Sequence, residues 1–158
     1  MGFLAGKRIL ITGLISNRSI AYGIAKACHR EGAELAFTYQ NERFKDRMAK
    51  YADEFGSTAI YPCDVSQDAE IEAVFTELAK RWDGLDGLVH SIAFAPNEAI
   101  EGDFLEGISR ESFRIAHDVS SYSYPALAKA ARPLLLKGSN PSVLALTYLG
   151  AVRTMPNY

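Results

Sequence analysis

Lys7-Arg-Ile-Leu-Ile-Thr-Gly13-Leu-Ile-Ser-Asn-Arg-Ser19-Ile-Ala21 opens the chain with a short apolar run, a glycine and the start of an amphipathic segment. A continuous apolar run that ends at a glycine is typical of a buried strand in a parallel sheet. The segment after Ser19 has helical spacing and ends near Gly32, as expected for a helix with a glycine in its C-cap region. The stretch therefore predicts a strand, a tight loop and a helix, in that order.

The same alternation continues through the rest of the chain. Further apolar runs predict strands at residues 34–39, 58–61, 87–91 and 142–147. The segments between them predict helices at residues 42–55, after Ser66, and at about 110–131. Ser66 is expected to cap the second of these, and a bend is expected near Pro125. Strands and helices that alternate in this way predict an α/β fold, a Rossmann-like doubly wound parallel sheet with helices on both faces.

Size and composition narrow the function classes. The chain has 158 residues, of which 48% are hydrophobic, and this fits one domain over residues 1–158. A net charge of −2 gives no broad attraction for nucleic acid, and the longest uncharged stretch, 138–152, contains a proline and is too short to cross a membrane. Cys28 and Cys63 show no framework spacing, which indicates free thiols in a reducing cytoplasm. The three histidines show no metal-ligand spacing, so no metal is expected.

The loop after the first strand is the first candidate site, because ligands bind beyond the carboxyl ends of the strands in such sheets. At Gly13 the backbone can approach a pyrophosphate, and the N–H groups of the following helix can bind it. The alternative is a glycine needed only for a tight turn, since the GxGxxG pattern is absent. Ser19 either offers its hydroxyl to the phosphate or caps the helix from Ile20, and capping is the favoured interpretation.

The ends of the later strands supply further candidates. Gln40 ends the second strand, where the adenosine ribose of a dinucleotide would lie, and its neutral side chain favours NADH over NADPH. Asp64 would hydrogen-bond the adenine amino group while Val65 packs on the ring, and the small apolar segment 91–96 would lie against the nicotinamide ribose. The alternatives are a surface glutamine, a helix-capping aspartate and a simple turn.

Tyr158 is the candidate catalytic residue. A phenol with a pKa near 10 is neutral at pH 7 and can donate a strong hydrogen bond to a developing oxyanion. Tyrosines are also common at helix starts for packing reasons, so this residue acquires weight only together with the rest of the pattern.

Several segments carry more specific motifs: Ile11-Thr-Gly13, 19–25, 29–40, Cys63-Asp-Val65, 86–87, 89–96, 116–123, Tyr148-Leu-Gly150 and Pro156-Asn-Tyr158. In this order they resemble the short-chain dehydrogenase/reductase family and, more closely, its NADH-dependent enoyl-acyl-carrier-protein reductases of type I. Carbonyl-reducing members place a catalytic serine about a dozen residues before the tyrosine, where this chain has Leu144-Ala-Leu146. The aromatic Tyr148 in that region is similar to the enoyl reductases and favours reduction of a C=C bond.

The resemblance implies hydride transfer from NADH to Cβ of a trans-2-enoyl thioester on acyl carrier protein. Tyr158 and a cofactor ribose hydroxyl would then stabilise the enolate charge on the thioester oxygen. Ala95 would contact the acyl substrate, Tyr148 would flank it, and the enzyme would be a cytoplasmic homotetramer. The residues implied to line the NADH site are Gly13, Ser19, Ile20, Gln40, Asp64, Val65 and Ile92.

The end of the sequence departs from that family pattern. The family pairs its tyrosine with a lysine after six intervening residues, whereas this sequence ends at Tyr158. We therefore expect a C-terminally incomplete domain with the first five of seven strands, and an isolated polypeptide that is inactive and poorly stable, because a sheet cut there has an open hydrophobic edge. Two alternatives stay open: a non-catalytic dinucleotide-binding module, and a short-chain reductase of another substrate.

Overall fold

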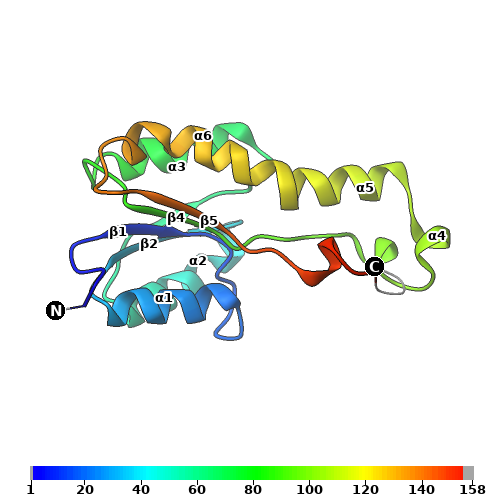
Figure 1. Ribbon diagram of the computed structural model, residues 1–158, viewed down its shortest axis with the longest axis horizontal. Helices are drawn as coiled ribbons and strands as arrows, with labels where there is room; N and C mark the ends of the chain where they lie inside the picture. Colours follow the sequence, from blue (N-terminus) through cyan, green and yellow to red (C-terminus); the bar gives the residue numbers. More distant parts are fainter. Residues whose placement is uncertain (1, 155–158) are drawn as a thin grey trace.

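The computed structural model describes residues 2–154 and shows one sheet of five parallel strands (Figure 1). The strand order is β3-β2-β1-β4-β5, so the chain proceeds outward from β1 in one direction and then returns to build the other half from β4. This arrangement confirms the predicted Rossmann-like α/β fold. The strands are β1 (Arg8–Ile11), β2 (Glu34–Tyr39), β3 (Ile60–Pro62), β4 (Gly87–His90) and β5 (Ser142–Ala145).

Helices cover both faces of the sheet. Successive side chains of a strand point to opposite faces, so each strand contributes to the packing beneath both sets of helices. Ile9 and Ile11 of β1 pack in the core beneath α1 (Ile20–Arg30) and α2 (Lys45–Glu54). Leu10, between them, belongs to the other core, beneath α3 (Asp68–Leu78) and α6 (Ser123–Leu135) (Figure 1). The continuous apolar run of β1 therefore serves two cores at once.

Two helix starts differ from the sequence-based expectation. The segment predicted as one helix over 42–55 begins with a 3-10 turn, η1 (Glu42–Phe44), before α2. The prediction that Ser66 caps α3 is wrong, because Gln67 is the N-cap residue. The Ser66 hydroxyl and N–H both donate to Oδ1 of Asp64, at 2.7 and 3.0 Å, so Ser66 stabilises the preceding turn instead.

The helix predicted over 110–131 is interrupted, as the proline suggested, but upstream of it. α5 (Arg110–His117) passes into a π-helical turn, η3 (Asp118–Tyr122), and then into α6. Pro125 has no N–H to donate to the carbonyl of Ser121 four residues earlier, and its ring would crowd that carbonyl. A wider turn at this point relieves the conflict, and the Ser123 N–H bonds to the Asp118 carbonyl five residues back.

A smaller part of the chain projects beyond the carboxyl edge of the sheet (Figure 1). It contains η2 (Asn97–Ala99), α4 (Phe104–Gly107) and the start of α5, and η4 (Leu149–Ala151) lies near it. Within residues 2–154, no helix has the length and apolar character needed to cross a membrane.

β5 is the edge of the described sheet. It pairs with β4, and all four of its residues are exposed, with Val143 and Leu144 at 37% and 49% of their full exposure. Apolar side chains and unpaired backbone groups on one edge strand favour association with other chains.

We predict that Leu10→Ala lowers the free energy of unfolding by roughly 2–5 kcal/mol, because Leu10 is fully buried in the α3/α6 core and its loss leaves a cavity. The matched control is Leu136→Ala, which removes the same atoms from a side chain that is 72% exposed and should change stability by less than about 0.5 kcal/mol. Urea denaturation measures both variants. Equal losses would contradict the assignment of Leu10 to a packed core.

Candidate functional site

A cleft of about 620 Å³ opens at the carboxyl ends of β1 to β4, and we refer to it as the carboxyl-edge cleft. It is lined from three sides: by the loops after β1 and β2, by the turns after β3 and β4, and by α5 with η3. Five of the residues selected from the sequence line this one cleft although they are far apart in the chain: Gly13, Gln40, Asp64, Val65 and Ile92.

Gly13 is required by a close approach between two loops. Its φ is +80°, a left-handed conformation that favours glycine. A Cβ added to this residue would lie 1.8 Å from the carbonyl oxygen of Ser91, in the turn after β4. The glycine therefore does more than complete a tight turn, because it lets the loop after β1 rest against the turn after β4.

Ser19 stands at the N-cap position of α1, but its hydroxyl does not cap the helix. Instead, its Oγ accepts hydrogen bonds from the N–H groups of Ile15 and Ser16, at 3.3 and 3.1 Å, so the favoured capping interpretation is wrong. The hydroxyl closes the loop onto itself because the loop N–H groups point back toward it. No side chain caps α1, and the Tyr22 N–H already bonds to the Ser19 carbonyl at 3.0 Å, so the N–H groups of Ile20 and Ala21 are the ones left to interact with an anion.

The end of β2 presents a neutral amide and a cation. Gln40 is exposed at the cleft, and Arg43 also lines it. The guanidinium of Arg43 lies over the ring of Phe44, 4.6 Å from its centroid. Asn41 lies between Gln40 and Arg43 in the sequence, and its buried Oδ1 atom has no hydrogen-bond partner in the described structure.

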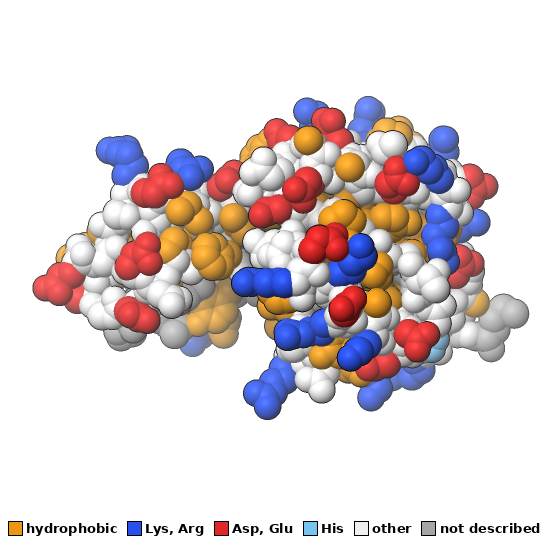
Figure 2. Space-filling view, turned by 180° about the vertical axis from the view of Figure 1, so that it is seen from behind, with side chains coloured by type: hydrophobic (Ala, Val, Ile, Leu, Met, Phe, Trp, Pro, Cys, Tyr) orange, Lys and Arg blue, Asp and Glu red, His pale blue; other side chains and the backbone are white. Residues whose placement is uncertain are grey.

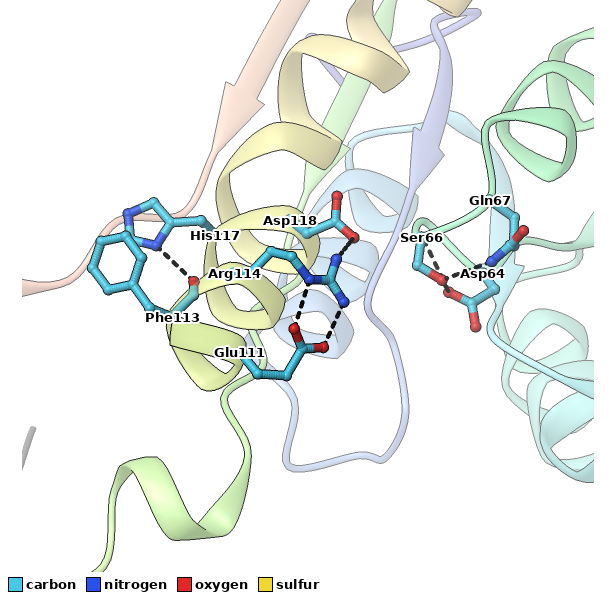
Figure 3. Close-up of polar contacts among 8 residues, drawn as sticks. All are labelled: Asp64, Ser66, Gln67, Glu111, Phe113, Arg114, His117 and Asp118. Carbon is cyan, nitrogen blue, oxygen red and sulfur yellow. Dashed lines mark hydrogen bonds and ion pairs between the residues drawn. The ribbon is translucent and has the colours of Figure 1, made fainter. Parts of the chain in front are cut away.

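The turn after β3 supplies one polar wall of the cleft. The N–H of Asp64 donates to Oε2 of Glu70 at 2.7 Å, and the Asp64 carboxylate accepts from Ser66 through Oδ1 (Figure 3). Val65, next in the chain, is buried and adds an apolar side chain to the lining of the cleft. The turn thus places a fixed acceptor beside an apolar surface, which suits the edge and the face of a planar ring.

The opposite wall was not found by sequence analysis. Arg114 and Asp118 line the cleft from α5 and η3, across from Asp64 and Ser66 (Figure 3). Glu111 receives two hydrogen bonds from the Arg114 guanidinium, at 2.7 and 3.0 Å, and this holds the pKa of Glu111 below its ordinary value. Asp118 belongs to the motif at residues 116–123, but no local sequence pattern places this segment or Arg114 beside the cleft.

A second cavity of about 460 Å³ adjoins the cleft, and we refer to it as the apolar cavity. It lies within the projecting part of the chain, where a group of hydrophobic side chains is surrounded by acidic and basic ones (Figure 2). Ala93 and Phe94 line both spaces. The apolar lining residues include Ala95, Ile100, Phe104, Ile108, Phe113 and Ala116, so Ala95 faces this cavity rather than the cleft.

The remaining candidates do not line the carboxyl-edge cleft. Ser19 and the exposed Ile20 are at the start of α1 and are not among the residues that line the cleft. Tyr148 is half exposed before η4 and lines neither cavity. Tyr158 lies outside the described residues. The structure therefore brings together the cofactor-site candidates better than the substrate-site candidates.

His90 lies at the end of β4, and the two cysteines lie in other parts of the fold. His90 is buried against Ser123, with 2.7 Å between Nε2 and Oγ, and burial lowers its pKa. Cys28 and Cys63 are free thiols, as predicted. Among residues 2–154, no group of three or more His, Cys, Asp and Glu side chains is arranged to hold a metal ion.

Comparisons with known proteins agree on one family. Residues 13–158 match the family model described as enoyl-(acyl carrier protein) reductase. The chain is 63% identical to the enoyl-acyl-carrier-protein reductase (NADH) FabI of Neisseria meningitidis and 56% identical to that of Escherichia coli, in both cases over the whole chain and 60% of the relative. The crystal structure of the Aquifex aeolicus enoyl-acyl-carrier-protein reductase (NADH) superposes with a TM-score of 0.95 and 47% identity, over 99% of this chain and 66% of that one. The chain thus spans about 60% of the length of these curated relatives.

We predict that Gly13→Ala destabilises the chain more than Gly56→Ala. Both glycines have positive φ and pay a similar backbone cost, roughly 1–2 kcal/mol, but only Gly13 has an atom within reach of an added Cβ. The clash with Ser91 should add about 1–3 kcal/mol to the loss in unfolding free energy, measured by urea denaturation. Equal losses in the two variants would show that the loops do not meet as described.

We predict that Cys63 resists alkylation at pH 8. Burial, assisted by the Glu70 and Asp64 carboxylates, raises the pKa of this thiol to about 12, so the reactive thiolate is scarce until the pH rises toward that value. Mass spectrometry after iodoacetamide treatment should show modification at least about tenfold slower than in the urea-unfolded chain. Similar rates in the two states would contradict the buried position of Cys63.

Proposed function

The chain belongs to the enoyl-(acyl carrier protein) reductase family, and we propose that it serves the NADH-dependent reduction of the trans-2 double bond in enoyl-acyl-carrier-protein thioesters. Such a protein is an oxidoreductase of fatty-acid elongation. The observation that carries the proposal is the convergence of Gly13, Gln40, Asp64 and Ile92 on one cleft at the carboxyl edge of the sheet, where nucleotides bind in this fold.

We propose that an extended dinucleotide occupies the cleft. The loop at Gly13 has no side chain in the way, and the start of α1, just beyond the cleft-lining residues 13–15, carries a partial positive charge that would favour a pyrophosphate. Ser19 would support this loop from behind. When bound, NADH would supply the hydride, while the chain's own residues bind, orient and shield it.

The remaining cleft residues divide between the two ends of the cofactor. At the adenosine end, Gln40 would meet the ribose, Asp64 would accept from the adenine amino group and Val65 would pack on the ring. A neutral Gln40, with the Arg43 guanidinium held over Phe44, supports NADH rather than NADPH. At the other end, Ile92 and the turn around it would face the nicotinamide ribose.

The substrate would enter beside that turn. Ala95 would contact the acyl chain from the apolar cavity, and Tyr148 would flank the enoyl group. The Tyr158 phenol would donate a hydrogen bond to the thioester oxygen as enolate charge develops there, which stabilises the transition state more than the ground state. Protonation at Cα would then complete the saturated chain.

We further propose the oligomeric state, the cellular location and the protein partner. Residues 1–158 would form a single NAD-binding domain of a cytoplasmic homotetramer whose partner is acyl carrier protein. The isolated 158-residue polypeptide would be inactive and poorly stable, and the exposed Val143 and Leu144 of β5 would favour its aggregation.

An assay of NADH oxidation, followed at 340 nm, tests the proposal. The enzyme in this assay is a polypeptide as long as the curated relatives. Oxidation should require a trans-2-enoyl thioester and should not occur with a 3-oxoacyl thioester of the same chain length. Activity on the 3-oxoacyl substrate alone would favour a carbonyl reductase. Tight NADH binding without turnover of either substrate would favour a non-catalytic dinucleotide-binding module.

We predict that Tyr158→Phe lowers kcat for the enoyl thioester by about 10²–10³-fold, the usual cost of removing one oxyanion donor, with little change in the Kd for NADH. The matched control is Tyr22→Phe, which removes a phenol hydroxyl that donates to Glu54 at 2.7 Å on the exposed surface of α1. The control should retain normal kcat. A similar kcat in both variants would remove Tyr158 from the proposed chemistry.

A further inference from the structure

One serine holds both backbone groups of a distant residue. Oγ of Ser120, in η3, accepts a hydrogen bond from the N–H of Phe94 at 2.9 Å and donates one to the carbonyl of Phe94 at 3.0 Å. A hydroxyl has one proton to donate and lone pairs to accept with, so both contacts form at once. The two hydrogen bonds fasten the turn after β4 to η3.

The fastened turn is the partition between the two spaces described above. Phe94 and Ala93 line both the carboxyl-edge cleft and the apolar cavity, with Ile92 on the first side and Ala95 on the second. The segment 91–96 has neither helical nor strand structure, so no ladder of backbone hydrogen bonds defines its path. Its conformation therefore depends on a small number of specific contacts, of which the Ser120 clamp contributes two.

The position of Ser120 is itself determined by the π-helical turn. Ser123 donates its hydroxyl proton to the carbonyl of Val119 at 2.6 Å, and the Ser123 Oγ also lies 2.7 Å from Nε2 of His90 at the end of β4. Because the serine proton is already committed, His90 supplies the proton of the second bond. Ser123 and His90 are almost fully buried, so they fix η3 against the sheet. The same turn brings Asp118 and Val119 into the cleft.

We propose that Ser120 is a positioning residue for the reductase, one that holds the Ile92–Ala95 turn as a rigid partition between the cofactor and the acyl substrate. The effect of Ser120 on catalysis rests on the proposed function, whereas its two hydrogen bonds to Phe94 are a property of the fold. Without the hydroxyl, the turn would lose two hydrogen bonds and the partition would sample other paths. The acyl substrate would then have to order this turn as it binds, which weakens its binding.

The test compares Ser120→Ala with Ser120→Thr, which retains a hydroxyl, and with Thr76→Ala as the matched control. Thr76 also donates its hydroxyl to a backbone carbonyl, that of Glu72 at 3.0 Å, but on the exposed face of α3. The first readout is amide hydrogen exchange in the unliganded full-length protein. Exchange at Phe94 should accelerate about tenfold in Ser120→Ala, recover in Ser120→Thr and stay unchanged in Thr76→Ala.

The second readout is kinetic. For Ser120→Ala, KM for the enoyl thioester should rise about tenfold while kcat falls by less than about threefold, and Ser120→Thr should restore most of the loss. Normal exchange at Phe94, or faster exchange with unchanged KM and unchanged Kd for NADH, would overturn the proposal. Absence of enoyl reduction by the wild-type protein would instead refute the proposed function, and exchange and NADH affinity would still decide whether the clamp shapes the cleft.

Discussion

The close approach of Gly13 to the carbonyl of Ser91 is the constraint on which the carboxyl-edge cleft depends. β1 and β4 are parallel neighbours in the sheet, and after them the chain turns toward opposite faces. Their loops therefore diverge and leave a space between the flanking helices. The space is usable only if the two loops begin close together. A side chain at position 13 would force them apart, so the absence of a Cβ there is a condition for the geometry of the whole cleft.

Around this contact, short polar interactions keep an otherwise irregular rim in place. Ser19 closes the first loop, Asp64 holds Ser66 in the turn after β3, and Ser120 fastens the turn after β4. Each is a hydroxyl or carboxylate that bonds to backbone groups left unpaired where regular structure ends. The rim is thus ordered before any ligand arrives, which lowers the conformational cost of binding.

Much of this architecture was predictable from sequence because it follows from local pattern. The apolar run of β1 and the amphipathic spacing of α3 specify strands and helices, and the carboxyl-end rule then selects Gly13, Gln40 and Asp64. The contributions of Arg114 and Asp118 were missed, since they depend on where a π-helical turn places one helix in space. The predicted capping roles of Ser19 and Ser66 are wrong, because a hydroxyl near a helix start can bond to the preceding loop instead of to the helix.

Amide hydrogen exchange with and without NADH would show whether the cofactor binds in the carboxyl-edge cleft. With NADH bound there, we expect slower exchange in the Gly13–Ala21 segment, in the Asp64–Val65 turn and at residues 92–94, with no change in the edge strand β5. Protection confined to the apolar cavity, or none at saturating NADH, would contradict binding in this cleft.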